Sequence, residues 1–281
     1  MGSPSPHLPD SNSPQEEAYT HGYTPVFTQY LSRRTAATNA AFFLPYLQPG
    51  MRVLDCGCGP GTITIGLAQA VAPGQVVGID IEPGQIEVAQ ALAAEQQVHN
   101  VSFQVASVYQ VPFPDNSFDA VFGHSILEHV GRPLEALREV HRVPKPGGLI
   151  GLREVDQGGN LLEPTSPILE KSLELQEKVW QLNGGNPHIG RRLRALLTKA
   201  GFINTRASAS YDSYGTPGEV SIWAERMIDH FSQSSLSDRL VELGWADRAT
   251  LEQICTAWRD WADHPNAFYA RARVEVIGWG G

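Results

Sequence analysis

The sequence predicts an α/β fold in which helices cover both faces of a mainly parallel sheet. Two observations lead to this prediction. A short apolar run at 53–56 enters a turn with three alternate glycines, and residues 62–70 then carry apolar side chains at helical spacing. A second apolar run follows at 75–79. Strand, tight turn, helix and strand in this order form a βαβ unit, whose two strands run parallel.

The composition indicates the class of protein. A chain of 281 residues with 42% hydrophobic residues can bury a large core, and this length suits one α/β domain with an elaboration. The net charge of −9 argues against general affinity for nucleic acid or anionic membranes. Cys56 and Cys58 have no further Cys or His nearby in sequence, so we expect no metal site. Without a signal peptide or a long apolar stretch, we expect a cytoplasmic protein with no membrane span.

The glycine turn is suited to a ligand. Gly57, Gly59 and Gly61 permit positive φ and lack a Cβ that would collide with a bound molecule. The free N–H groups of the following helix face the same place. Asp80 ends the second strand about 20 residues further on, where a βαβ nucleotide fold places a carboxylate that binds the ribose hydroxyls. The sequence therefore predicts a cofactor that contains a nucleoside.

Two residues distinguish between cofactor classes. A dinucleotide-binding turn has its third small residue at position 62, which is Thr62 here. Asp55 would not help to bind a pyrophosphate, but it would attract a cofactor that carries an ammonium group. An NAD-dependent oxidoreductase is therefore disfavoured, although it stays open as an alternative.

Four segments together resemble the class I S-adenosylmethionine-dependent methyltransferases, and within them the small-molecule group similar to the ubiquinone and menaquinone biosynthesis enzymes. They read VLDCGCGPG at 53–61, VGID at 77–80, VPFPDNSFDAV at 111–121 and VPKPGG at 143–148, and the resemblance covers roughly residues 50–155. It implies a Rossmann-like fold, for which we expect seven strands. It also implies an enzyme that uses S-adenosylmethionine and releases S-adenosylhomocysteine.

The N-terminal region is expected to differ from the core. Residues 1–16 are rich in Pro and Ser and predict a disordered leader, whereas 17–48 predict lid helices, with helical spacing at 33–47. In the methyltransferases that the chain resembles, such a segment folds over cofactor and substrate. Tyr19 and Tyr23 are therefore candidate substrate contacts, and packing against the core is an equally weighted alternative for them.

The remaining elements follow from local patterns. After Asp80 we expect a helix at 85–94, strands at 100–105, 118–122 and 149–155, and a helix at 133–143. Further on we expect helices at 167–182 and 190–200 and strands at 202–214 and 270–279. The core would comprise 49–214 and 266–281. The Trp-rich helical segment at 215–265 would form a cap over the substrate pocket.

Further positions complete the predicted cofactor site. Ile81 is suited to stack on the adenine, and Ser107 stands where relatives place an acid that accepts from the adenine amino group. His124 ends the fourth strand, and ligands of doubly wound sheets bind at strand carboxyl ends where the strand order reverses. The full set of predicted cofactor contacts is Asp55, Gly57, Cys58, Gly59, Gly61, Asp80, Ile81, Ser107, Val108 and His124.

The predicted reaction is an in-line displacement at an activated methyl group, so the protein mainly aligns the reactants and excludes water. A base is needed only if the acceptor must lose a proton, and His129, His21 and His188 are the candidates because imidazole titrates near neutrality. Packing is the alternative role for His129. Arg191 is a candidate for binding an anionic substrate or for pairing with Glu154.

The aromatic lid and cap favour a small apolar or aromatic acceptor. Whether the methylated atom is O, N, C or S stays open, as does the oligomeric state. A methyltransferase-like protein that binds the cofactor without catalysis is a further alternative.

Overall fold

The computed structural model describes residues 24–281. The predicted leader and the candidates Tyr19, His21 and Tyr23 lie outside the described residues. Within 24–281 no helix combines the length and the apolar character needed to cross a membrane.

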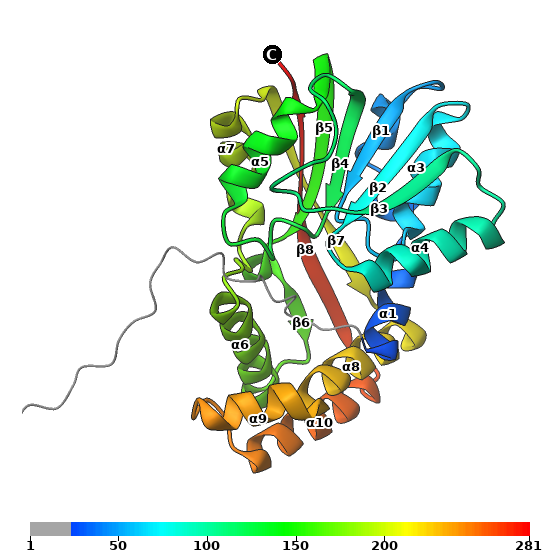
Figure 1. The fold of residues 1–281 in the computed structure, drawn as a ribbon. Coiled ribbons are helices and arrows are strands. Elements are labelled where there is room, and N and C mark those ends of the chain that lie inside the picture. Colours follow the sequence, from blue (N-terminus) through cyan, green and yellow to red (C-terminus); the bar gives the residue numbers. More distant parts are fainter. Residues whose placement is uncertain (1–23) are drawn as a thin grey trace, which may run out of the picture.

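One eight-stranded sheet forms the centre of the described chain (Figure 1). The strands are β1 (Arg52–Cys56), β2 (Gln75–Asp80), β3 (Val101–Val105), β4 (Phe118–His124), β5 (Pro144–Val155), β6 (Leu161–Glu163), β7 (Ile203–Tyr214) and β8 (Phe268–Trp279). Five strands are parallel in the order β3-β2-β1-β4-β5, and β8 is antiparallel to β5. The predicted doubly wound, mainly parallel sheet is confirmed.

The strand count differs from the seven predicted. Along one edge, β8 pairs first with β6 and then with β5, while β7 pairs along its other edge. The additional strand β6 is only three residues long, too short for an alternating pattern to reveal.

Strand order reverses between β1 and β4. The chain proceeds outward from β1 to β2 and β3, and then returns to add β4 on the opposite side of β1. Connections leave the carboxyl ends of β1 and β4 toward opposite sides, which opens a crevice at this edge of the sheet.

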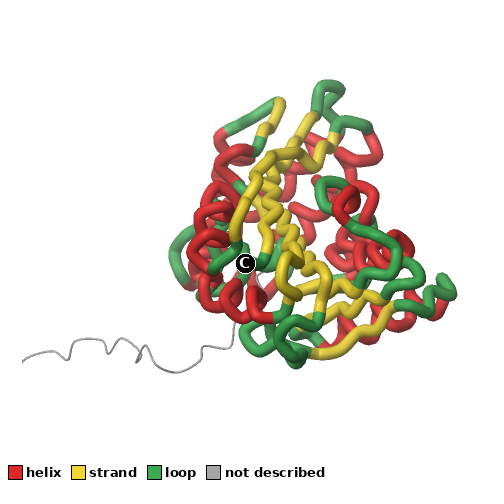
Figure 2. Tube along the Cα trace, turned by 90° about the horizontal axis from the view of Figure 1, so that it is seen from above, coloured by secondary structure: helices red, strands yellow, loops and turns green. Residues whose placement is uncertain are grey.

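Helices lie on both sides of the sheet (Figure 2). α3 (Thr62–Val71) and α4 (Pro83–Glu95) lie on one face, and α5 (Pro133–Arg142) and α7 (Leu193–Ala200) on the other. Successive residues of β1 pack on opposite faces of the sheet, because side chains alternate in direction along a strand. Val53 packs in the cluster that contains Leu67 of α3, whereas Leu54 packs in the cluster that contains Leu137 of α5, and both β1 residues are fully buried.

The predicted continuous helix at 33–47 is wrong. The structure has α1 (Pro25–Ser32), α2 (Ala36–Asn39) and a 3-10 turn at Leu44–Tyr46. Pro45 has no N–H to donate, and its ring would collide with the carbonyl one helical turn earlier, so a helix cannot continue through it.

A second hydrophobic core lies beyond the sheet, where β6, β7 and β8 extend toward a helical layer (Figure 1). The helices of this layer are α6 (Pro167–Leu182), α8 (Pro217–Ser232), α9 (Ser234–Glu242) and α10 (Arg248–Ala262), and α1 joins them. Trp223 and Trp258 are fully buried within this core. The prediction that the segment at 215–265 is helical is confirmed, with α8, α9 and α10 in this region.

Candidate active site

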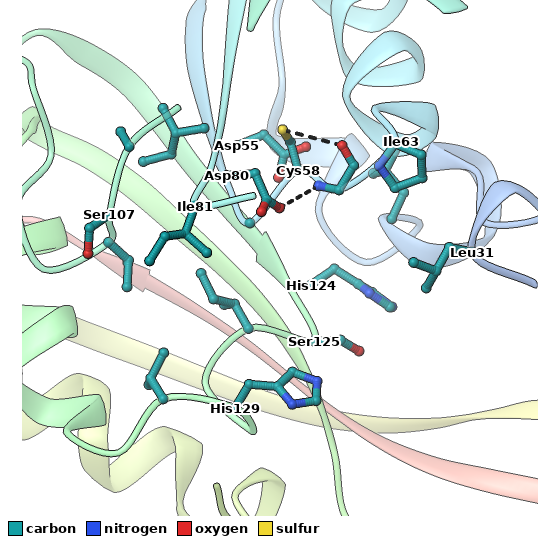
Figure 3. A pocket seen from close by; sticks show the side chains of 18 of the residues that line it. Leu31, Asp55, Cys58, Ile63, Asp80, Ile81, Ser107, His124, Ser125 and His129 are labelled. Carbon is teal, nitrogen blue, oxygen red and sulfur yellow. Dashed lines mark hydrogen bonds between the residues drawn. The ribbon is translucent and has the colours of Figure 1, made fainter. Parts of the chain in front are cut away.

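A cavity of about 150 Å³ lies at the crevice between the carboxyl ends of β1 and β4 (Figure 3). Nine of the ten predicted cofactor contacts line it: Asp55, Gly57, Cys58, Gly59, Asp80, Ile81, Ser107, Val108 and His124. His129 lines it as well. Long-range folding therefore brings these residues to one place.

The three glycines of the turn have different roles, although all have positive φ. A Cβ on Gly57 would lie 3.0 Å from Cδ1 of Ile126, whereas a Cβ on Gly59 would meet nothing closer than 3.9 Å. Gly59 thus leaves open space beside the pocket. Gly61 does not line the pocket, and its Cβ would lie 2.8 Å from the Cβ of Ala89, so the structure assigns it to packing of α3 against α4.

Asp80 retains capacity to bind a ligand. Its Oδ2 accepts a hydrogen bond from the Gly59 N–H at 2.8 Å and its Oδ1 accepts one from the Glu82 N–H at 3.0 Å. A carboxylate offers about four lone-pair positions, so both oxygens can each accept a further bond. Beside it, the apolar side chain of Ile81 is 64% exposed and lines the pocket. An exposed apolar surface next to a free carboxylate suits a nucleoside, with its flat base and its ribose hydroxyls.

Asp55 is buried and poised between its two charge states. Thr64 Oγ1 donates to its Oδ2 at 2.6 Å. Burial, with a contribution from the charge of Asp80, raises the pKa of Asp55 to about 7. A cationic ligand group beside this carboxyl would favour the ionised form.

Arg34 is a pocket residue that the sequence prediction missed. It is half-buried and is the one Lys or Arg among the described residues that line the pocket. Within residues 24–281 it pairs with no carboxylate, and its guanidinium lies 5.7 Å from the ring centre of Tyr30. In the sequence it stands beside Arg33, and nothing local distinguishes the two.

His129 lies in the wall of the pocket, but both ring nitrogens already have partners. Trp180 Nε1 donates to Nδ1 at 3.1 Å, and Nε2 lies 3.4 Å from Oε1 of the buried Glu128. Because Nδ1 accepts, the proton of the neutral ring sits on Nε2 and faces the carboxylate. This arrangement leaves no nitrogen of His129 ready to take a proton from an acceptor.

The turn of residues 125–130, which follows β4, is held by Glu154, which the sequence analysis named only as a possible partner of Arg191. The fully buried Glu154 carboxylate accepts from the backbone N–H groups of Ile126, Leu127 and Glu128 at 3.0–3.1 Å. In return, Glu128 Oε2 accepts from the Val155 N–H at 3.0 Å. Burial and the neighbouring Glu128 raise the pKa of Glu154 to about 8.

His188 and Arg191 do not line this pocket. Arg191 makes a two-pronged ion pair with Asp156, so the predicted pairing with Glu154 is wrong. His188 contacts the Glu177 carboxylate at 3.1 Å and accepts from a backbone N–H through Nδ1. These contacts hold the loop after β5, away from the glycine turn.

Comparison with known proteins supports the interpretation of the fold and shows the family. Residues 47–201 match the family described as Methyltransferase domain. An uncharacterized methyltransferase of Schizosaccharomyces pombe is 32% identical over 269 residues, which are 92% of this chain and 95% of that protein. Demethylmenaquinone methyltransferase of Geobacillus stearothermophilus is 39% identical over 112 residues, 40% of this chain and 48% of that enzyme.

The fold also matches solved methyltransferase structures. A phosphoethanolamine N-methyltransferase of Haemonchus contortus, crystallised with S-adenosylhomocysteine, superposes with a TM-score of 0.57 and 18% identity, over 90% of this chain and 56% of that one. The family match spans more than half of the chain and the fission yeast relative spans almost all of it. The chain therefore belongs to the class I S-adenosylmethionine-dependent methyltransferases, in the group that contains the menaquinone-biosynthesis enzymes.

Proposed function

We propose that this methyltransferase holds S-adenosylmethionine in the pocket of Figure 3 and methylates a small organic acceptor located toward the helical layer. The observation that carries the proposal is the match between the lining side chains and the parts of the donor. The pocket offers an exposed apolar side chain, a free carboxylate and two oppositely charged groups.

The nucleoside part of the donor suits one end of the pocket. Asp80 has free lone pairs for the two ribose hydroxyls, and Ile81 offers an apolar surface to the adenine. Ser107 Oγ accepts from the Tyr109 N–H at 3.2 Å and keeps one lone pair for the adenine amino group. Gly59 lets the donor approach the backbone.

The amino-acid part of the donor suits the pair Asp55 and Arg34. Asp55 would face the ammonium group, as its position in the sequence predicted, and Arg34 would face the carboxylate. Opposite charges at the two positions fix the orientation of the methionine chain, because exchanging its two ends would bring like charges together.

The helical layer supports the proposed position of the acceptor. α1 contributes Leu31 to the pocket and Arg34 follows two residues after its end, while Phe27, Tyr30 and Leu31 of α1 pack into the second hydrophobic core. An acceptor on this side of the pocket would meet the apolar side chain of Leu31, which favours an apolar or aromatic molecule. We therefore propose the segment 215–265 as a substrate cap and propose His129 as a wall of the pocket rather than as a base.

When bound, the donor supplies an activated methyl group on a sulfonium. The residues of this chain would hold that group in line with the acceptor, and the turn of residues 125–130 and α1 would exclude water. An acceptor atom with a free lone pair needs no base in this arrangement.

Calorimetric titration of the full-length protein with S-adenosylhomocysteine tests the proposal. Binding is expected for the unaltered chain, NAD is expected not to compete, and Arg34→Gln should weaken binding at least about tenfold through loss of a charged hydrogen bond. Arg33→Gln, one residue away and outside the pocket lining, is the matched control and should bind normally. Equal affinities of the two variants would contradict the assigned role of Arg34. Donor binding without product from any acceptor would favour a non-catalytic binding protein.

A further inference from the structure

The neighbours of His124 determine where its ring carries a proton. Nε2 of His124 lies 3.3 Å from Nδ2 of Asn39 and 3.1 Å from Nη1 of Arg153. Arginine only donates hydrogen bonds. Asn39 is oriented because its Oδ1 accepts from the Thr35 N–H at 3.1 Å and from the Thr38 hydroxyl at 2.8 Å, which turns Nδ2 toward the histidine. Both neighbours donate to Nε2, so Nε2 is unprotonated.

The remaining nitrogen is a donor without a partner. Burial and the charges of Arg34, Arg273 and Arg153 hold the pKa of His124 well below its ordinary value, so the ring is neutral. A neutral ring with an unprotonated Nε2 carries its proton on Nδ1. Nδ1 is buried and has no hydrogen-bond partner among residues 24–281, although the residue lines the pocket. Buried donors in folded proteins are nearly always paired, so this N–H calls for a ligand atom that accepts.

The next residue supplies a second donor in the same place. Ser125 Oγ accepts from Nη1 of Arg273 at 2.7 Å, which leaves its own hydrogen free to donate. Ser125 also lines the pocket, and its φ of +56° lies in the left-handed region that non-glycine residues rarely adopt. Figure 3 shows His124 and Ser125 next to each other, separated from Asp80 and Ile81 at the nucleoside end.

A rigid charged layer stands behind the two donors. Asp212 accepts from Nη2 of Arg153 at 2.7 Å and from Nε of Arg273 at 2.8 Å, and Glu275 accepts from Nε of Arg153 at 3.1 Å. Both arginines are almost fully buried. The layer fixes both donors in position, and the charges of its two arginines are balanced by the carboxylates of Asp212 and Glu275.

We propose that Nδ1–H of His124 and Oγ–H of Ser125 form a donor pair that binds an oxygen atom of the methyl acceptor. The acceptors of this enzyme therefore carry a hydroxyl or carbonyl oxygen close to the methylated atom. This inference rests on the proposed donor site. The donor's own carboxylate is the competing source of oxygen, but the charged Arg34 suits a carboxylate, whereas two uncharged donors suit a hydroxyl or carbonyl.

Two substitutions distinguish the roles of the two ring nitrogens of His124. In His124→Gln the longer amide reaches the place of Nε2 and removes the Nδ1 donor, whereas in His124→Asn the shorter amide occupies the place of Nδ1 and can still donate. Ser125→Ala removes only the hydroxyl and serves as a second variant if His124→Gln does not fold. Melting temperatures with and without S-adenosylhomocysteine check that each variant is folded and binds the donor product.

The probes are 1-naphthol and naphthalene, compared by ligand-observed NMR in the presence of saturating S-adenosylhomocysteine. The unaltered protein is expected to bind 1-naphthol about tenfold more tightly than naphthalene, the effect of one well-formed hydrogen bond. His124→Asn should keep this preference, and His124→Gln and Ser125→Ala should reduce it toward equality. Nitrogen-15 NMR of the His124 ring should show the Nδ1–H tautomer.

Three results would overturn the inference: an Nε2–H tautomer, no preference for 1-naphthol in the unaltered protein, or a preference retained in both His124→Gln and Ser125→Ala. A fourth result would be that His124→Gln binds S-adenosylhomocysteine more weakly but binds 5′-methylthioadenosine, which lacks the amino-acid part, as the unaltered protein does. In that case the donor pair of His124 and Ser125 would bind the carboxylate of the methyl donor. If the unaltered protein does not bind S-adenosylhomocysteine at all, the proposed donor site fails instead.

Discussion

Replacing Asp55 by asparagine should remove a pH dependence from donor binding. The pKa of Asp55 is raised from 3.8 to about 7 by burial, so below neutrality the carboxyl is mostly protonated. A ligand ammonium group prefers the ionised form, and binding must then remove the proton. If only the ionised form binds, the apparent Kd rises about tenfold between pH 8 and pH 6, which corresponds to about 1.4 kcal/mol. The amide of the Asp55→Asn variant would stay uncharged over this range, so the affinity of the variant should not follow this titration.

Folding stability should change with the opposite sign. In the unfolded chain the Asp55 carboxyl ionises near 3.8, whereas in the folded chain it keeps its proton up to about 7. Between these values the folded state binds more protons, so the contribution of Asp55 to the free energy of unfolding falls as pH rises from about 4 to about 7 and then levels off. At about 1.4 kcal/mol per pH unit, the total is roughly 4 kcal/mol. Thr64 can still donate to the amide oxygen of the Asp55→Asn variant, so the local contact survives.

Both effects are measured in the unaltered protein and in Asp55→Asn. Titration calorimetry with S-adenosylhomocysteine at several pH values between 6 and 8 gives the Kd. Urea unfolding between pH 4 and pH 8 gives the free energy of unfolding. Asp119→Asn is the control, because Asp119 lies outside the pocket lining and pairs with Lys145. This control should keep the pH dependence of donor binding. A Kd of the unaltered protein that does not change with pH, or an unchanged slope in Asp55→Asn, would refute the role given to this carboxyl.

Two further predictions concern the glycine turn and the turn of residues 125–130. Gly61→Ala should lower the free energy of unfolding by about 1–3 kcal/mol more than Gly59→Ala in urea titrations, because only the Gly61 Cβ would collide, at 2.8 Å from the Cβ of Ala89; the reverse order would contradict the packing role of Gly61. Glu154→Gln should weaken S-adenosylhomocysteine binding about tenfold in calorimetry, because its amide oxygen can still accept from the Ile126 and Leu127 N–H groups, whereas its NH₂ group would face the Glu128 N–H and cannot accept from it. Glu139→Gln, whose amide oxygen can still accept from the Val111 N–H outside the pocket lining, should bind normally, and equal effects of the two substitutions would argue against a specific role of Glu154.

The nucleotide-binding part could be predicted from the sequence because its signals are local. The apolar run of β1, the positive-φ glycines and the acid at the end of β2 each depend on a few neighbouring residues. The helix at 167–182 and the terminating Gly201 of α7 were also predictable for this reason. The same local reading failed at 33–47, where apolar spacing suggested one helix but Pro45 prevents it.

The charged parts of the site could not be predicted in this way. Arg34 and Arg33 are equivalent in sequence, and only the packing of α1 beside the glycine turn places one of them at the pocket. In the sequence, His124 and His129 both stand near the end of a predicted strand, and nothing local distinguishes their hydrogen bonding. Their different states depend on Arg153, Asn39, Trp180 and Glu128, partners that for the most part come from distant segments.

The sequence by itself therefore determined the βαβ unit, the class of cofactor that suits it and many of the residues that line the pocket, because backbone preferences act over a few residues. Only the tertiary structure decided which arginine faces the pocket, which histidine nitrogen can donate and why Glu154 matters. Those outcomes depend on burial and on contacts between segments far apart in the chain, and both set charge and hydrogen bonding only after the chain has folded.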